Sequence, residues 1–321
     1  MLDSELWHQH AIYNRLQSLL MFVVMGGFLA LLGWLLWGGD GIIWLLMLGM
    51  FLLLLNPIAS PWMIMRMYRA VPLGSHQAPG LSQALKELAR RADLSKMPSL
   101  YYIPSSMINA FTVGRRDEAA IAVTDGLLRS LDSREIIGVL AHEVSHIRSN
   151  DTWVMSVADL FSRLTNMLSL FGLFLLFINL PLLLLSYIGI SWFAILILIF
   201  APNLSAMAQL GLSRTREYDA DLNAARLTGD PEGLARALVK IERSSGSLFE
   251  RVFMPGRPVP EPSLLRTHPP TVERVHRLMS LERGKWDVLE PLRQRLGIAS
   301  ELDMGYSVRR SPRWHVTGLW H

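Results

Sequence analysis

The sequence contains no cysteine, and charged residues occupy only 18% of its 321 positions. Without thiols the chain has no disulfide, no thiolate ligand and no cysteine nucleophile, so a metal ion would be bound by His, Asp or Glu. The scarcity of charge stands against 51% hydrophobic residues, which excludes an intrinsically disordered chain and an ordinary water-soluble globule. The composition therefore predicts a protein that lies partly in a lipid bilayer.

The sequence also lacks a concentrated basic patch. Its 31 Lys and Arg residues are scattered among 27 Asp and Glu residues, and the net charge is only +4. Surfaces that bind nucleic acid concentrate basic residues on one face, commonly together with aromatic side chains. Nucleic acid is therefore not an expected partner.

Three stretches without charged residues are long enough to cross a bilayer, which takes about 20 apolar residues. The first two lie at 16–39 and 41–65, and only Asp40 separates them. The third, at 164–213, is long enough for two helices, which would join near 179–181 or near 187–189. The sequence therefore predicts four transmembrane helices in two hairpins.

Basic residues flank the outer ends of these stretches, whereas the two hairpin turns carry none. The flanking residues are Arg15, Arg66, Arg69, Arg163, Arg214 and Arg216. Because Lys and Arg accumulate on the cytoplasmic side of membrane proteins, both termini and the polar segments are expected to face the cytoplasm. The residues before the first stretch lack the pattern of a cleavable signal peptide, so this stretch is expected to remain as an anchor.

The alternation of apolar and polar segments divides the chain into four parts. They are a transmembrane hairpin at 1–69, the first part of a soluble domain at 70–158, a second transmembrane hairpin at 159–212, and the second part of the soluble domain at 213–321. The predicted fold class is a mainly α integral membrane protein with a cytoplasmic, α-rich domain that includes a small β-sheet.

Apolar periodicity predicts the elements of the soluble domain. Helices are expected at 81–94, 135–150, 214–228, 231–244 and 270–283, strands at 100–104, 109–113 and 119–123 with a hairpin, and a loop at 246–265. Asp132 and Glu135 have the spacing of a capping box at the start of the second of these helices.

That second helix carries His142, Glu143 and His146 in the pattern H-E-x-x-H. Positions four apart on an α-helix lie about 40° apart in rotation and about 6 Å apart along the axis, so both imidazoles can bind one metal ion. The carboxylate of Glu143 can take a proton from a metal-bound water and return it to a leaving amine. With histidine ligands and no cysteine, Zn²⁺ is the expected ion. Asp151, five residues past His146, is expected to have a structural role at the end of the helix.

A catalytic zinc ion has three protein ligands and one open position, so a third ligand is needed. Glu217 is the most suggestive candidate, and Asp221, one helical turn later, is placed to accept a hydrogen bond from a histidine N–H. Alternatively, Glu217, Asp219 and Asp221 are solvated partners of Arg214 and Arg216. The H-E-x-x-H pattern favours the metal site over this alternative.

Four segments carry a resemblance to a known family. They are INAF at 108–111, AHEVSHIRSND at 141–151, SRTREYDADLNAA at 213–225 and THPPTVERV at 267–275. Together they resemble the HtpX-type membrane zinc metallopeptidases, which are related to the CAAX prenyl proteases, and the four-span plan is similar as well. The residues after about Arg283 match none of these motifs.

The resemblance implies a zincin-like (gluzincin) catalytic domain with one Zn²⁺ per subunit. The ion would be bound by His142, His146 and Glu217. Glu143 would be the general base, and Asp221 would support a histidine ligand.

The resemblance also implies that Asn109, Ala110 and Phe111 border the cleft and pair with the substrate backbone. His268 and Arg274 would reach the site to orient it or to stabilise the oxyanion. Each assignment has an alternative: Asn109 can be a turn residue, Phe111 a core residue, His268 a residue at the start of a helix, and Arg274 a surface charge.

The sequence thus predicts a membrane-embedded zinc endopeptidase. The resemblance implies that its substrates are misfolded or damaged membrane proteins and that it serves quality control in a bacterial inner membrane. One alternative is a narrowly specific processing peptidase of the CAAX-protease type. Another is a catalytically silent membrane adaptor whose metal site is structural. The oligomeric state is left open.

Overall fold

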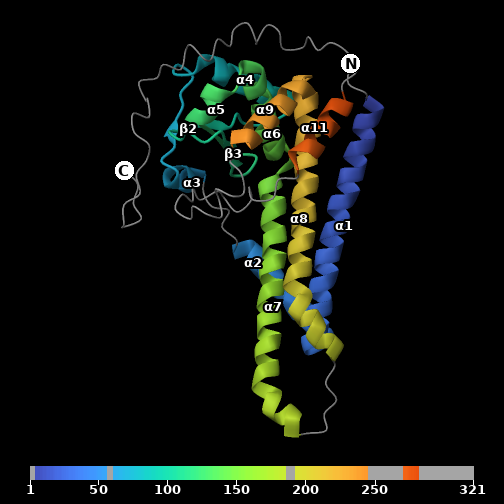
Figure 1. The fold of residues 1–321 in the computed structure, drawn as a ribbon. Coiled ribbons are helices and arrows are strands. Elements are labelled where there is room, and N and C mark those ends of the chain that lie inside the picture. The colour runs from blue at the N-terminus through green and yellow to red at the C-terminus, as the bar shows by residue number, and fades with distance from the viewer. Residues whose placement is uncertain (1–3, 56–60, 186–191, 245–269, 282–321) are drawn as a thin grey trace.

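The computed structural model describes residues 4–55, 61–185, 192–244 and 270–281. The predicted loop at 246–265, His268 and the tail after Arg283 lie outside the described residues. Figure 1 shows a head of short helices and strands, from which the long helices α1, α7 and α8 extend side by side. The apolar stretches of the sequence thus form one elongated part of the molecule and the polar segments form another.

The elongated part consists of four helices. They are α1 (Ser4–Trp37), α2 (Gly39–Leu55), α7 (Asp151–Leu185) and α8 (Trp192–Thr228). Three segments of α1, α7 and α8 are long and apolar enough to cross a membrane, at His8–Leu35, Asp151–Ile178 and Leu196–Thr228. The chain is therefore a mainly helical protein with three candidate membrane helices among its described residues.

The first predicted hairpin turn lies where the sequence placed it. Gly38 separates α1 from α2 with a positive φ of 68°, a backbone conformation that glycine adopts without steric cost. The helix α2 is apolar but has only 17 residues, so the count of four spans remains a prediction.

The head contains a four-stranded sheet and the remaining helices. The strands are β1 (Val71–Pro72), β2 (Ser99–Ile103), β3 (Ala110–Val113) and β4 (Ala120–Thr124). The helices are α3 (Pro61–Met67), α4 (Pro79–Arg91), α5 (Asp125–Ser130), α6 (Ser133–Ser149), α9 (Pro231–Ser244) and α11 (Thr271–Ser280).

The strands lie in the order β1-β2-β4-β3. The predicted hairpin is present, since β3 and β4 pair antiparallel, but β2 pairs with β4 in parallel rather than with β3. The strand β3 therefore lies at one edge of the sheet. The two-residue strand β1 is too short to give a periodic signal and was not predicted from the sequence.

Successive side chains of β3 lie on opposite faces of the sheet. Phe111 and Val113 pack with Met65 of α3 on one face of the sheet, while Ala110 belongs to the main core with α6 on the other. Because side chains alternate along a strand, Thr112 also points towards α6. The edge strand and the H-E-x-x-H helix are consequently in contact.

The ends of α6 are fixed by local interactions. Asp132 accepts a hydrogen bond from the backbone N–H of Glu135, and the Glu135 carboxylate accepts one from the backbone N–H of Asp132, which is the predicted capping box. At the other end Asn150 adopts a left-handed conformation, and α7 begins at the next residue. The chain therefore turns sharply just after the motif.

The helix α8 continues from the apolar stretch into the head without interruption. Its last turns pack against α6, which also packs closely on α9. At Gly138 a Cβ atom would lie 2.8 Å from the backbone nitrogen of Leu234, so this contact of α6 with α9 requires glycine. This packing brings residues 213–228 next to the motif on α6.

Candidate metal centre

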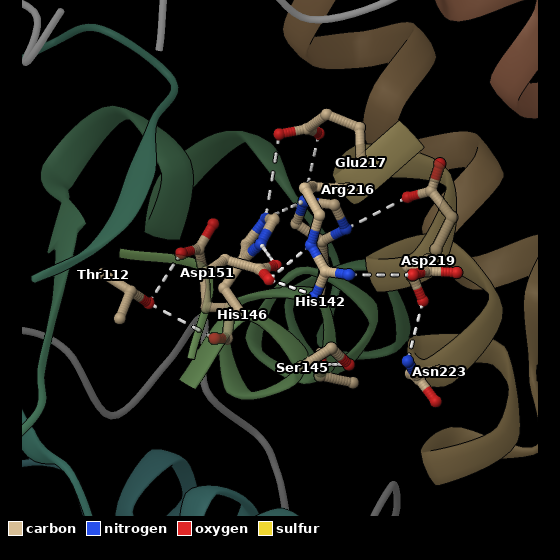
Figure 2. A network of polar contacts seen from close by, with 12 residues as sticks. Thr112, His142, Ser145, His146, Asp151, Arg216, Glu217, Asp219 and Asn223 are labelled. Atoms are coloured by element: carbon tan, nitrogen blue, oxygen red, sulfur yellow. Dashed lines mark hydrogen bonds and ion pairs between the residues drawn. The ribbon is translucent and has the colours of Figure 1, made fainter. Parts of the chain in front are cut away.

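His142 and His146 lie one turn apart on α6, and their imidazoles face each other. The two Nε2 atoms are 3.1 Å apart, and the ring planes are nearly perpendicular at 88°. Glu217 reaches them from α8, with one carboxylate oxygen 3.4 Å from His142 Nε2 and the other 3.7 Å from His146 Nε2 (Figure 2). The structure therefore brings all three predicted ligands together.

These distances fit a single metal ion. Two ligand atoms that each lie about 2.0–2.1 Å from a tetrahedral zinc ion are separated by roughly 3.3 Å. The two Nε2 atoms are 3.1 Å apart, one Glu217 oxygen lies 3.4 Å from His142 Nε2, and the other Glu217 oxygen lies 3.7 Å from His146 Nε2, so these separations are near this value. The group of His142, His146 and Glu217 can bind a metal ion.

The other ring nitrogen of His142 is held by an aspartate. Asp221 Oδ1 lies 3.0 Å from His142 Nδ1, and the same carboxylate accepts two 2.7 Å hydrogen bonds from Arg274 of α11. Arg274 also lies 3.2 Å from a carboxylate oxygen of Glu217. A carboxylate at Nδ1 places the proton there and leaves the Nε2 lone pair for a metal ion.

His146 is held in the same way by a different aspartate. Asp151 Oδ2 accepts a 2.7 Å hydrogen bond from His146 Nδ1, and Asp151 Oδ1 accepts hydrogen bonds from Nε and Nη2 of Arg216. The sequence pattern predicts only a structural role for Asp151, at the end of the helix. Its contact with His146 depends on the sharp turn at Asn150, which the residue pattern alone does not reveal.

The acidic environment changes the protonation of both histidines. Burial alone lowers the pKa of His142, but the hydrogen bonds and charges of Asp221 and Glu217 outweigh burial and raise it to about 10. For His146 burial again opposes the charge, and Asp151 raises the pKa above its ordinary value. Without a metal ion the site therefore favours imidazolium, and a metal ion that binds must displace protons.

Arg274 is the buried counter-charge of this site. Burial alone lowers its pKa, but Asp221 and Glu217 raise it above the ordinary arginine value. Only 4% of the residue is exposed. The alternative in which Arg274 is a surface charge is therefore wrong.

The acidic residues of α8 are not solvated partners of surface arginines. Glu217, Asp219 and Asp221 are 7%, 8% and 3% exposed. Arg216, which the sequence also grouped with the basic residues flanking the membrane, binds Asp151 and Asp219 in the head. The solvated alternative is wrong because the packing of α8 against α6 removes these side chains from water.

Glu143 lies beside the two histidines and is 7% exposed. Its carboxylate accepts a 2.7 Å hydrogen bond from the hydroxyl of Thr112 on β3. The motif search did not single out Thr112, although its alternation with Phe111 along a strand could have placed it on the α6 side. The hydroxyl fixes the direction of the Glu143 side chain.

The predicted substrate-binding residues lie at the edge strand. Asn109 precedes β3, and its backbone N–H donates a 3.0 Å hydrogen bond to the hydroxyl of Thr124. Ala110 and Phe111 are buried, and the ring of Phe111 packs against Tyr68 at 5.1 Å. The side chain of Phe111 is thus a core residue, as one alternative had it.

Comparisons with known proteins place the chain among proteases. The model of Peptidase family M48 matches residues 75–282. The chain is 38% identical over 67% of its length to a "Protease HtpX homolog" of Acaryochloris marina, 76% of which is covered. It is also 35% identical over 80% of its length to a "Protease HtpX homolog" of Aquifex aeolicus, 89% of which is covered.

Among solved structures, the crystal structure of S. mikatae Ste24p aligns with a TM-score of 0.49 at 23% identity, over 84% of this chain and 66% of that chain. The family match spans most of the chain and includes all three side chains that could hold a metal ion. The chain therefore belongs to peptidase family M48, and it is a membrane metalloprotease.

Proposed function

We propose that this membrane metalloprotease is a zinc endopeptidase with one Zn²⁺ per chain, bound by His142, His146 and Glu217. The observation that carries the proposal is the convergence of the two histidine Nε2 atoms and the Glu217 carboxylate, with each histidine held by its own aspartate. Two nitrogen donors and one carboxylate, without a thiolate, are a donor set of catalytic zinc. Three protein ligands leave one position open for water or substrate.

Zinc bound at this site would supply Lewis acidity and would lower the pKa of a bound water to about 7. Glu143 would be the catalytic residue, a general base placed to accept a proton from water and to donate it to the leaving amine. Thr112 holds the Glu143 carboxylate in place by donating its hydroxyl proton. Because this hydrogen bond uses one carboxylate oxygen, the other is available to the water.

The edge strand β3 is proposed to bind the substrate. An extended peptide can add to the free edge of a sheet through main-chain hydrogen bonds, which recognise a backbone without regard to its side chains. Asn109, Ala110 and Phe111 would border the substrate, with the main-chain hydrogen bonds made from β3 itself, since the backbone N–H and C=O of Asn109 already pair with Thr124, and β3 runs next to Glu143. This arrangement suits a peptidase that accepts many unfolded sequences.

Arg274 is proposed to orient the site rather than to contact the oxyanion. Its guanidinium already donates two hydrogen bonds to Asp221 and lies against Glu217. The assignment of His268 to the oxyanion remains a prediction.

The membrane arrangement and the substrates complete the proposal. The chain would span the inner membrane four times with the site and both termini in the cytoplasm, and it would cleave misfolded or damaged membrane proteins. The proposed division is a hairpin at 1–69, the catalytic domain at 70–158 and 213–321, and a second hairpin at 159–212. Support comes from the three candidate spans and from the position of the site in the head, next to the ends of those helices.

The test is cleavage of casein and of an unfolded membrane protein by the full chain purified in detergent, with zinc content measured on the same sample. Glu143→Gln should abolish cleavage and retain zinc, whereas Glu118→Gln, at an exposed position in the turn before β4, should change neither. A chelator should abolish cleavage and zinc should restore it. Undiminished cleavage by Glu143→Gln would refute the catalytic role.

A map of the cleavage products by mass spectrometry separates the two peptidase functions. Cuts scattered through unfolded polypeptide support quality control. A single cut near a modified terminus would instead support a processing peptidase, and zinc binding without any cleavage would support an adaptor.

A further inference from the structure

A continuous chain of polar contacts connects the N-terminal helix α1 to the ligand His146. Asn14 of α1 donates a 2.8 Å hydrogen bond from Nδ2 to Asp219 Oδ1. The other oxygen of Asp219 lies 3.1 Å from Arg216 Nη1, and Arg216 also binds Asp151. Asp151 in turn holds His146 Nδ1. In Figure 2 the guanidinium of Arg216 lies between Asp151 and Asp219.

The buried charged groups in this series of polar contacts each need a hydrogen-bond partner. Arg216 is bound to both buried carboxylates, Asp151 and Asp219, and each has one further donor, His146 for Asp151 and Asn14 for Asp219. A buried carboxylate needs hydrogen-bond donors to offset its lost hydration. Asn14 supplies such a donor to Asp219, and because its amide is neutral it adds no charge to the buried pair.

Asn14 is an unusual residue for its position. It is 0% exposed although it lies beside Arg15, just before the uncharged stretch at 16–39, and a fully buried amide commonly has a specific partner. Its Oδ1 has no hydrogen-bond partner among the described residues, so the contact with Asp219 is what offsets its burial. A leucine would fill the same space without a buried polar group.

We propose that Asn14 is a positioning residue of the metal centre, which acts on His146 through Asp219, Arg216 and Asp151. Asn14 holds the Asp219 carboxylate in place, and Asp219 in turn holds one side of the Arg216 guanidinium. The other side of that guanidinium thereby orients the Asp151 carboxylate at His146 Nδ1. The position of the first membrane helix thus contributes to the geometry of a ligand on α6. This inference rests on the metal site of the proposed function.

A second polar contact between long helices offers a matched control. Ser162 of α7 donates a 2.8 Å hydrogen bond to Gln209 of α8 and lies 3.1 Å from Ser205. It resembles the contact of Asn14 with Asp219 in joining two long helices, but no contact in the described residues continues from it to the metal centre. If Asn14 only held helices together, Asn14→Leu and Ser162→Ala would behave alike.

The experiment measures zinc affinity by competition with a chromophoric chelator, on the full chain in detergent, for the wild type, Asn14→Leu and Ser162→Ala. Asn14→Leu should weaken zinc binding about 3- to 10-fold, less than the roughly 10- to 100-fold expected for a direct partner of a ligand. It should also change the visible absorption spectrum of the Co²⁺-substituted protein. Ser162→Ala should leave both measurements unchanged.

A double-mutant cycle tests the route of the coupling. In an Asp151→Asn background, Asn14→Leu should cause no further loss of zinc affinity, because the link to His146 is already broken. Full additivity, an unchanged affinity in Asn14→Leu, or an equal loss in Ser162→Ala would each overturn the inference. If Asn14→Leu does not yield folded protein, Asn14→Ser, whose hydroxyl is too short to reach Asp219, provides the same test.

The failure of this inference is distinct from failure of the proposed function. Wild-type protein that binds no zinc would contradict the metal site itself. If Asn14→Leu binds zinc as tightly as the wild type does, only the role of Asn14 is contradicted.

Discussion

The two histidine ligands are held by arrangements of the same chemistry that lead to opposite ends of the chain. In the His142 branch, comprising His142, Asp221 and Arg274, the contacts end on α11 near the end of the described residues. In the His146 branch, comprising His146, Asp151, Arg216, Asp219 and Asn14, the contacts end on α1. Both branches place an aspartate on Nδ1 and an arginine on the aspartate.

The difference lies in how each arginine is used. Arg274 stays within the site, since it contacts both Asp221 and the ligand Glu217. Arg216 instead connects Asp151 to Asp219, which lies farther from the ligands on the side of α1. The His142 branch therefore balances charge at the metal, whereas the His146 branch links the metal centre to the membrane helices.

Replacing Arg274 with leucine is expected to have the largest effect. The change leaves Asp221 and Glu217 buried without their counter-charge, and breaking a buried ion pair costs about 3–5 kcal/mol. Thermal unfolding of the zinc-free protein in detergent should show the lowered stability. Zinc should restore part of the loss, because a bound cation compensates the charge of Glu217.

Arg216→Leu is the matched variant of the other branch. It should destabilise the protein less than Arg274→Leu, because Arg216 is more exposed and Asp151 and Asp219 retain hydrogen bonds from His146 and Asn14. Equal shifts in Tm for the two arginine variants would contradict the proposed difference between the branches.

Removal of the metal ion should lower the stability of the fold. The ligands come from α6 and α8, so a bound ion joins these helices, and at a free zinc concentration 100 times the Kd it stabilises the fold by about 2.7 kcal/mol. A chelator should lower Tm accordingly in the wild type. The Tm of His142→Ala should change little when zinc is added. If zinc raises the Tm of this variant as much as that of the wild type, zinc stabilises the protein at another site.

Replacing the aspartates tests each branch at its contact with the ligand. Asp221→Asn and Asp151→Asn should each weaken zinc binding roughly 10- to 100-fold, because an amide fixes the histidine tautomer less well than a carboxylate does. Chelator competition measures both variants. Asp93→Asn is the control, since Asp93 is exposed and has a positive φ that asparagine also tolerates. A comparable loss of affinity in the control would show that the assay responds to surface charge.

The smallest effect is expected outside both branches, at the start of α6. Asp132→Ala removes half of the capping box and should cost about 1 kcal/mol of stability. Zinc affinity of the folded protein should not change, because Asp132 lies more than two turns from His142. A large loss of zinc affinity would mean that the placement of the histidines depends on the cap as well as on the aspartates.

Much of the site could be predicted from short-range patterns. The spacing of His142 and His146 on one helix, the capping box before them, and the spacing of Glu217 and Asp221 on another helix all follow from the α-helical repeat. The hairpin of β3 and β4 was likewise indicated by two short apolar runs around a glycine turn. In each case the interacting residues are near one another in the sequence.

The missed features depend on how strands pair, how the chain turns between helices, and how helices pack. The pairing of β2 with β4 reverses the order in which the strands follow one another, and no local pattern encodes it. Asp151 was placed at the end of a helix because its distance from His146 in sequence does not reveal the turn between α6 and α7. Arg216 was grouped with the membrane-flanking residues because its sequence context matches that role equally well.

The sequence by itself determined that the chain enters a membrane, that one helix carries His142, Glu143 and His146 at the spacing of a metal site, and that a second helix carries Glu217. These conclusions rest on composition and helical periodicity, which are local properties. Only the tertiary structure decided which charged groups support the ligands. Arg216 meets Asp151 across 65 positions, Arg274 meets Asp221 across 53, and Asn14 meets Asp219 across 205. Such contacts depend on the packing of α1, α6, α8 and α11, because burial leaves each charged or polar side chain only the partners that neighbouring helices bring to it.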